Sequence, residues 1–281
     1  MKKQLLLVLS ALFFVFNSCS NHNEKINVMT YNIRLDTEAD GYNMWDNRKE
    51  GIVSLIKEED VDILGIQEGL PHQIEYLSKQ LKDYDFIGEG RDGGNKGEYS
   101  AIYFKNEKII LKEEETFWLS ETPEIPSIGW DAALNRIVTL GVFEIKNSKK
   151  ELIVYNTHFD HVGKVAREKS ASIILNHITK NNYQDKPTVV MGDFNANPDE
   201  SPIKLLSEQL QDSFKVLPVK DPIGTFSGFD LCSKLLNRID YIFTKKINII
   251  DYKHIDKKLP SGLWPSDHLP ILISISFEKF Q

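Results

Sequence analysis

Cysteine is scarce in this chain of 281 residues, which contains only Cys19 and Cys232. The scarcity excludes a fold stapled by several disulfides and disfavours a zinc site built from clustered cysteines. Stability must therefore come from an apolar core, for which 41% hydrophobic residues provide enough material. Linkers rich in proline, glycine and serine are also lacking, which favours one large domain.

An excess of positive charge is missing as well, since the formal net charge is −7 at pH 7. The first 18 residues contain Lys2 and Lys3 and no acidic residue, so their removal takes away two positive charges and leaves −9. Such a surface attracts a long polyanion weakly, which disfavours a dedicated nucleic-acid-binding protein. An acidic protein can still carry a local cationic groove.

One long hydrophobic run is present, at the N-terminus. Residues 5–16 follow two lysines and are too short to span a bilayer with their flanks, so residues 1–18 are predicted to be a cleaved signal peptide. The next residue, Cys19, follows a small serine, which resembles the processing site of bacterial lipoproteins. We therefore expect a lipid on Cys19, a tether over residues 19–24 and a location in the bacterial cell envelope, periplasmic or surface-exposed. The alternative is an ordinary signal peptide followed by an incidental cysteine.

Residues 25–281 are predicted to form one α/β domain. Strand-like apolar runs occur at 25–35, 61–68, 100–104, 136–145, 151–159, 187–191, 238–244 and 269–277. Helical periodicity occurs at 44–59, after Pro71 and at 162–178, where Val162, Val165, Ala166 and Ile173 form one stripe. Hairpins outnumber regular strand-helix-strand units, which favours two stacked mixed β-sheets flanked by helices over a doubly wound parallel sheet.

Five of the strand-like runs end in polar residues capable of chemistry, namely Asn32, Glu68, His158, Asp193 and Asp240. The edge of a rigid sheet can hold side chains to the tolerance that catalysis requires. Each residue alone also has a structural explanation, such as a turn, a helix cap or a satisfied histidine. Their joint occurrence is what favours an active site.

Six ordered motifs carry a resemblance to a known family. They are Tyr31-Asn32-Ile33-Arg34, Gln67-Glu68, Asn156 to His161, Gly192 to Pro198, Arg238 to Ile242 and Ser266 to Pro270. Together they resemble the endonuclease/exonuclease/phosphatase superfamily, which includes deoxyribonuclease-I-like nucleases, sphingomyelinases and inositol polyphosphate 5-phosphatases. The resemblance covers about residues 25–277 and implies a four-layered α/β sandwich that hydrolyses phosphoesters with a metal ion.

The resemblance also implies roles for single residues. Mg²⁺ prefers oxygen ligands, with Mn²⁺ or Ca²⁺ as candidate substitutes. Glu68 is the expected metal ligand, with Asn32 and Asp267 completing or orienting the metal shell. Asp193 is the expected general base toward water, and Asn195 is expected to hold the phosphate or the water.

Charge on the phosphate oxygens needs cationic partners. His158 and His268 suit this role when protonated, and Asp240 is expected to keep His268 charged and oriented. Arg136 resembles a family arginine that can face the site, where a guanidinium suits phosphate recognition.

Three features bear on the substrate. Arg34 stands where nuclease members often carry an acidic residue, which favours a different substrate. Glu98 is a further acidic residue near this set, but a solvated glutamate is the commoner case, so it receives no role. The segment 117–136 resembles a subgroup of bacterial members with poorly defined substrates, and Trp118 within it is expected to pack in a structural loop.

These observations predict a Mg²⁺-dependent hydrolase that works as a monomer outside the cytoplasm. Its expected substrate is a small phosphorylated molecule, such as a sugar or inositol phosphate, or a phosphodiester. A secreted nuclease acting on DNA or RNA is the alternative enzyme. A ligand-binding lipoprotein without activity is the third hypothesis, but it is expected to have lost Glu68, Asp193 or His268, and all three are present.

Overall fold

The computed structural model describes residues 24–219 and 223–277. The predicted signal peptide, Cys19 and most of the predicted tether lie outside these residues. The helices are α1 (Lys49–Glu58), α2 (Pro71–Gln80), α3 (Lys164–Lys180) and α4 (Ser201–Gln209), with short 3₁₀ helices η1 (Glu38–Asn43), η2 (Trp45–Asn47) and η3 (Ser213–Lys215). The strands are β1 (Ile26–Asn32), β2 (Ile63–Gln67), β3 (Tyr84–Ile87), β4 (Ile102–Lys105), β5 (Ile109–Trp118), β6 (Ile137–Ile145), β7 (Glu151–His158), β8 (Thr188–Asp193), β9 (Gln211–Asp212), β10 (Asp240–Lys245), β11 (Asn248–His254) and β12 (Ile271–Ser276).

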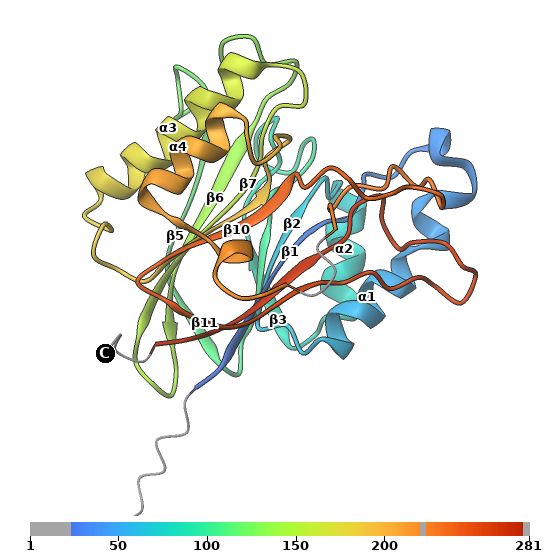
Figure 1. Cartoon of the computed structure of the whole chain (residues 1–281), viewed down its shortest axis with the longest axis horizontal. Helices are drawn as coiled ribbons and strands as arrows, with labels where there is room; N and C mark the ends of the chain where they lie inside the picture. Colours follow the sequence, from blue (N-terminus) through green and yellow to red (C-terminus); the bar gives the residue numbers. More distant parts are fainter. Residues whose placement is uncertain (1–23, 220–222, 278–281) are drawn as a thin grey trace, which may run out of the picture.

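The strands form two six-stranded sheets, with the orders β11-β12-β1-β2-β4-β3 and β5-β6-β7-β8-β10-β9. Each sheet has one parallel pair at its centre, β1 with β2 and β7 with β8. The other pairs are antiparallel. Figure 1 shows α1 and α2 on the outer side of the first sheet and α3 and α4 on the outer side of the second. The predicted four-layered sandwich of two mixed sheets flanked by helices is confirmed.

The topology brings the candidate residues to one edge of the sandwich. The parallel strands β1, β2, β7 and β8 end there. Because β10 and β12 run antiparallel to β8 and β1, they begin at the same edge, with Asp240 opposite Asp193. The loop that leads into β12 carries Asp267 and His268. Six segments that are distant in sequence therefore meet at one place.

Apolar side chains fill the space between the sheets, and one polar contact joins them beneath this edge. Asn156 of β7 donates from Nδ2 to the carbonyl oxygens of Ile66 at 2.8 Å and Ala101 at 2.9 Å, while its Oδ1 accepts from Gln67 Nε2 at 2.6 Å. Gly65 makes this approach possible, since a Cβ there would lie 2.7 Å from Asn156 Oδ1. The contact satisfies buried polar groups on both sheets and fixes their relative position.

Some predicted elements differ from the structure. The stripe predicted for α3 is wrong in part, because Val162 and Val165 are 59% and 49% exposed. The helix begins only at Lys164, after Val162, and its buried residues are Ala166, Arg167, Ser170, Ala171, Ile174, Leu175 and Ile178. The patterns also missed all of β5, α4 and β11, which are amphipathic or edge elements that mix apolar with charged residues.

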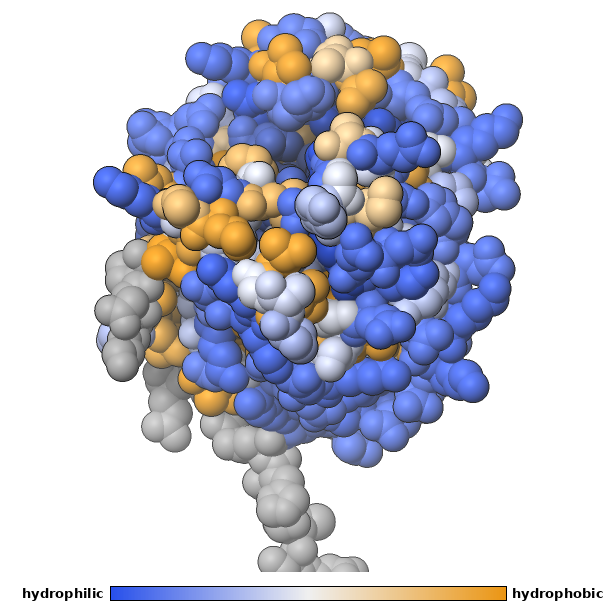
Figure 2. Space-filling model, turned by 90° about the vertical axis from the view of Figure 1, so that its right-hand side faces the viewer, coloured by the Kyte–Doolittle hydropathy of each residue, from blue (hydrophilic) through white to orange (hydrophobic). Residues whose placement is uncertain are grey.

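The surface is mostly polar on the face that forms the right-hand side of Figure 1. Figure 2 shows hydrophilic residues over most of this face, with apolar residues in separate groups. Cys232 is exposed and forms no disulfide with another described residue. Within residues 24–219 and 223–277, no helix is long and apolar enough to cross a bilayer.

A fully buried arginine ties the end of β1 to the loop before β12. Arg48 donates from Nη1 to the carbonyl oxygens of Ile33 at 2.8 Å and Pro265 at 2.7 Å, and from Nε to that of Asn43. Its guanidinium also lies 5.3 Å from the ring centroid of Phe229. Burial lowers the pKa of Arg48, so these carbonyl contacts and nearby acidic groups must compensate for the lost hydration.

We expect Arg48→Ala to lower the free energy of unfolding by at least about 3 kcal/mol, since three buried carbonyl groups would each lose a donor worth about 1–3 kcal/mol. Urea denaturation followed by tryptophan fluorescence measures the loss. The matched control is Lys57→Ala on the exposed side of α1, which should change stability by less than about 0.5 kcal/mol. A loss below about 1 kcal/mol for Arg48→Ala would show that water replaces the guanidinium.

Candidate active site

The candidate residues surround a cavity of about 390 Å³ at the shared edge of the two sheets. Its lining residues are Arg34, Leu35, Glu68, Arg91, Glu98, Leu134, Arg136, His158, His161, Asp193, Asn195, Phe226, Ile239, Asp267 and His268. Seven of the nine residues expected from the sequence belong to this lining. The other two, Asn32 and Asp240, are buried and hydrogen-bonded to lining residues.

Asn32 bridges carboxylates from the two sheets. Its Nδ2 lies 3.0 Å from Glu68 Oε1 and 3.0 Å from Asp193 Oδ2. Its Oδ1 accepts from the backbone N–H of Arg34 at 3.0 Å. In this arrangement the amide orients the two carboxylates, which places Glu68 and Asp193 in one cavity although they come from different sheets.

Three residues at the strand ends adopt the left-handed backbone conformation. Arg34, Glu68 and Asn195 have φ angles of 59°, 64° and 46°. This conformation is uncommon for residues other than glycine and costs about 1–3 kcal/mol where it is strained. Each of the three residues follows a strand and lines the cavity. The left-handed conformation therefore helps to direct these side chains toward the site.

Two aspartates face each other across neighbouring strands. Asp193 and Asp240 are register partners on β8 and β10 and are both buried. Burial and the negative charge of Asp240 raise the pKa of Asp193 to about 7. An aspartate with this pKa can accept a proton near neutral pH, which is what a general base requires.

His268 lies between these two aspartates. Its Nδ1 is 2.9 Å from Asp240 Oδ2, and its Nε2 is 3.7 Å from Asp193 Oδ2. Burial alone would lower the pKa of His268, but the charges of Asp240 and Asp193 outweigh it and raise that pKa well above its usual value. The imidazole is therefore positively charged at neutral pH.

His158 is electrostatically different from His268. Burial and the positive charge of Arg136 hold the pKa of His158 well below its usual value, so its ring is neutral at neutral pH. Its Nε2 lies 3.1 Å from Asn195 Nδ2 and 3.5 Å from Asp193 Oδ2. Of the two histidines expected to work when protonated, only His268 carries the charge in this environment.

Arg34 adds a second fixed positive charge. Its guanidinium forms a bidentate contact with Asp40, in which both N···O distances are 2.9 Å. It also lies 3.8 Å from Glu68 Oε2 and 3.8 Å from Asp267 Oδ2. Where nuclease members often carry an acidic residue, this chain therefore holds a cation against the acidic cluster.

Arg136 is positioned by an aspartate that received no role from the sequence. Asp160 Oδ2 lies 3.3 Å from Arg136 Nε, and Asp160 Oδ1 accepts from the backbone N–H of Val162 and Gly163. Despite burial, these backbone hydrogen bonds lower the pKa of Asp160 to about 2. Arg136 Nη2 also lies 3.0 Å from His161 Nδ1. Asp160 stands in the same motif as His158, and that position was the only signal for it.

The acidic cluster fits a hard divalent cation. Ligand atoms of Glu68, His158 and Asp193 lie within 4.8 Å of one another, and so do those of Asp193, Asp240 and His268. In the second group, His268 Nδ1 and Asp240 Oδ2 already contact each other at 2.9 Å. The first group is rich in carboxylate oxygens, and Asp267 lines the same cavity. Oxygen donors of this kind suit Mg²⁺, Mn²⁺ or Ca²⁺ better than a soft metal.

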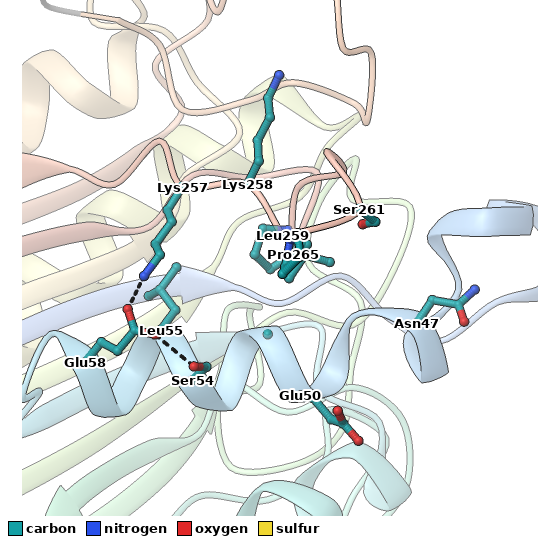
Figure 3. Close-up of a pocket in the computed structure, with 12 residues that line it drawn as sticks. Asn47, Glu50, Ser54, Leu55, Glu58, Lys257, Lys258, Leu259, Ser261 and Pro265 are labelled. Carbon is teal, nitrogen blue, oxygen red and sulfur yellow. Dashed lines mark hydrogen bonds and ion pairs between the residues drawn. The ribbon is translucent and has the colours of Figure 1, made fainter.

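A larger hollow lies elsewhere, between α1 and the loop of residues 257–265. It measures about 730 Å³ (Figure 3). Its lining contains no histidine, and Glu58 is engaged by Lys257 and by Ser54 Oγ at 2.9 Å. Size alone therefore does not identify the active site, whereas convergent polar groups with perturbed pKa values do.

Comparisons with known proteins agree with this geometry. The model of the endonuclease/exonuclease/phosphatase family matches residues 29–268. Protein L388 of Acanthamoeba polyphaga mimivirus is 28% identical over 250 residues, which cover 82% of this chain and 91% of the relative.

Two solved structures from Bacteroides thetaiotaomicron are also similar. A protein of the endonuclease/exonuclease/phosphatase family is 33% identical, with a TM-score of 0.87, and the match covers 91% of this chain and 96% of the other. Mannosyl-6-phosphatase Bt3783 is 33% identical, with a TM-score of 0.85, and the match covers 90% of this chain and 100% of the other. This chain therefore belongs to the endonuclease/exonuclease/phosphatase family and is a hydrolase of phosphoesters.

Proposed function

We propose that this protein is a Mg²⁺-dependent phosphomonoesterase that acts as a monomer on a small sugar phosphate outside the cytoplasm. The observation that carries the proposal is that several charged and titratable groups line the same cavity. Asp193 with a pKa of about 7, charged His268, and the guanidinium groups of Arg34 and Arg136 all line one cavity of about 390 Å³. This volume is in the range of small-molecule sites, about 300–1,000 Å³.

The charge distribution supports a small substrate over a polynucleotide. The whole chain carries a formal charge of −7, and Arg34 is directed at the acidic cluster through its contacts with Asp40, Glu68 and Asp267. A nucleic acid gains most of its affinity from many phosphate contacts along a cationic groove. The few cationic groups that converge on this cavity match a substrate with one phosphate group better than a polynucleotide. The mannosyl-6-phosphatase among the similar structures supports the same substrate class.

Each residue has a role that follows from its position. Asp193 accepts the proton of the attacking water, and Asn195 orients that water or the phosphate. His268, kept charged by Asp240, stabilises negative charge on the phosphoryl oxygens, and Arg136, held by Asp160, binds the phosphate. Glu68 and Asp267, oriented by Asn32 and Arg34, would hold the divalent ion. That ion neutralises charge on the transferring phosphoryl group when it is bound.

The direct test is release of inorganic phosphate from a hexose 6-phosphate and from p-nitrophenyl phosphate in the presence of Mg²⁺. We expect turnover of both monoesters, and loss of turnover in EDTA that excess Mg²⁺ restores. Bis-p-nitrophenyl phosphate and single-stranded DNA are the comparison substrates and should react at least about tenfold more slowly. Faster hydrolysis of DNA than of either monoester would instead favour the nuclease.

Asp193→Asn should reduce kcat by about 10²-fold to 10⁴-fold, because an amide cannot accept the proton of water. The free energy of unfolding should stay the same or rise, since the change removes a carboxylate buried beside Asp240. Steady-state kinetics and urea denaturation measure the two effects. A variant that keeps near-normal kcat would mean that another group is the base.

Glu68→Gln should raise the Mg²⁺ concentration for half-maximal activity at least about tenfold, because it removes one charge from the metal-binding cluster. Calorimetric titration with Mn²⁺ gives a readout that is independent of turnover and should show the same weakening. The matched control is Glu58→Gln, which lines the hollow of Figure 3 and should leave both values unchanged. Unaltered Mn²⁺ affinity in Glu68→Gln would remove Glu68 from the metal site.

The proposed location rests on the N-terminal sequence, with a lipid on Cys19 and cleavage after residue 18. A Cys19→Ala variant should move from the membrane fraction to the soluble fraction of the cell envelope. Immunoblotting of fractionated bacteria, together with mass spectrometry of the mature N-terminus, checks this outcome. A wild-type mature N-terminus that carries no lipid on Cys19 would contradict the lipid anchor.

A further inference from the structure

Two charged residues in the cavity have no part in the phosphoryl chemistry described above. Arg91 and Glu98 line the same cavity as Asp193 and His268. Their side chains are only 14% and 13% exposed, and Arg91 Nη2 lies 2.7 Å from Glu98 Oε1. An ion pair that is largely buried gives little net stability, because desolvation offsets the attraction. Because the pair lies in the proposed substrate cavity, we expect it to contribute to substrate recognition more than to the stability of the fold.

The loop between β3 and β4 holds this pair in a fixed position. The backbone N–H of Arg91 donates to the carbonyl oxygen of Glu98 at 2.9 Å. Gly90 packs so closely that a Cβ would lie 2.0 Å from the carbonyl oxygen of Lys96. Trp118 Nε1 donates to the carbonyl oxygen of Arg91 at 2.7 Å. The tryptophan expected to pack in a structural loop therefore ends β5 and anchors the loop that carries Arg91.

The pair lies beside the groups that hold the phosphate. A smaller hollow next to the main cavity is lined by Arg91 and Glu98 together with Arg136 and His158. Arg91 is within electrostatic reach of both neighbours, because its charge adds to the effect of burial in lowering the pKa of Arg136 and of His158. Arg91 and Glu98 are therefore within reach of a group attached to a phosphate at Arg136.

We propose that Arg91 and Glu98 bind two neighbouring hydroxyl groups on the leaving group of a hexose phosphate. The inference rests on the proposed phosphomonoesterase function and names the part of the site that selects the substrate. A carboxylate only accepts hydrogen bonds and a guanidinium only donates them, so the pair complements hydroxyl groups, which do both. An analogue without hydroxyl groups gains nothing from this pair, so we expect it to react more slowly than a hexose phosphate.

Glu98 is poorly placed to serve as a further metal ligand. Its Oε1 is already 2.7 Å from Arg91 Nη2, whereas the expected ligands Glu68 and Asp267 lie 3.8 Å from the Arg34 guanidinium. Burial raises the pKa of Glu98, and the charge of Arg91 partly opposes this effect.

The test compares two substrates on the full chain and three variants. Glu98→Gln and Arg91→Gln each remove one charged partner of the hydroxyl groups. Asp85→Asn is the matched control, because it makes the same carboxylate-to-amide change at an exposed position of β3, the strand that leads into this loop. A hexose 6-phosphate is the substrate with hydroxyl groups, and p-nitrophenyl phosphate is the substrate without them.

We expect Glu98→Gln and Arg91→Gln to raise KM for the hexose phosphate about 10-fold to 100-fold, since each weakens a charge-assisted hydrogen bond. The value of kcat/KM for p-nitrophenyl phosphate should change by less than about threefold. Asp85→Asn should leave the kinetics with both substrates unchanged. The Mg²⁺ concentration for half-maximal activity should be the same in all four proteins.

Three results would overturn the inference while leaving the proposed function intact. They are an equal loss on both substrates, a raised Mg²⁺ requirement in Glu98→Gln, and a wild-type protein that hydrolyses both substrates without preferring the hexose phosphate. The first would indicate a structural pair and the second a metal ligand. A wild-type protein that hydrolyses neither substrate would overturn the proposed function, and this inference with it.

Discussion

A single amide joins the two halves of the active site. Asn32 Nδ2 contacts a carboxylate oxygen of Glu68 on one sheet and of Asp193 on the other, both at 3.0 Å. Apolar packing holds the sheets together without fixing the distance between particular atoms, whereas a buried hydrogen-bonded amide does fix it. Because a catalytic group must be held to within about 0.5 Å, this contact sets the separation of the metal-binding and proton-accepting carboxylates. The contact between Asn156 and Gln67 supports it from beneath.

The same convergence concentrates negative charge in a buried place. Glu68, Asp193, Asp240 and Asp267 are all less than a tenth exposed. Burial and mutual repulsion raise the pKa of Asp193 and of Asp267, and His268 offsets part of the excess. A cation is the natural complement of such a cluster. The electrostatic arrangement that makes Asp193 a base near neutral pH is thus the one that attracts a divalent ion.

The sequence predicted the residues that end the strands, because a buried apolar run followed by a polar group is a local signal. It did not predict partners that depend on packing between distant segments. Arg48 and Asp160 act through contacts with backbone and arginine groups that no local pattern encodes. Glu98 looked like an ordinary solvated glutamate, and only the folded loop shows it buried against Arg91. The fold class followed from the balance of hairpins and helices, whereas the stripe of α3 was wrong in part because the helix begins only at Lys164 and turns a different set of residues toward the core.

The most direct test of this account is anomalous diffraction at the manganese edge from crystals soaked in Mn²⁺ and inorganic phosphate. We expect one manganese ion within ligand distance, about 2.0–2.4 Å, of a Glu68 oxygen, with the phosphate contacting both the ion and His268. Manganese between Asp240 and His268, or phosphate bound only in the hollow beside α1, would contradict the account.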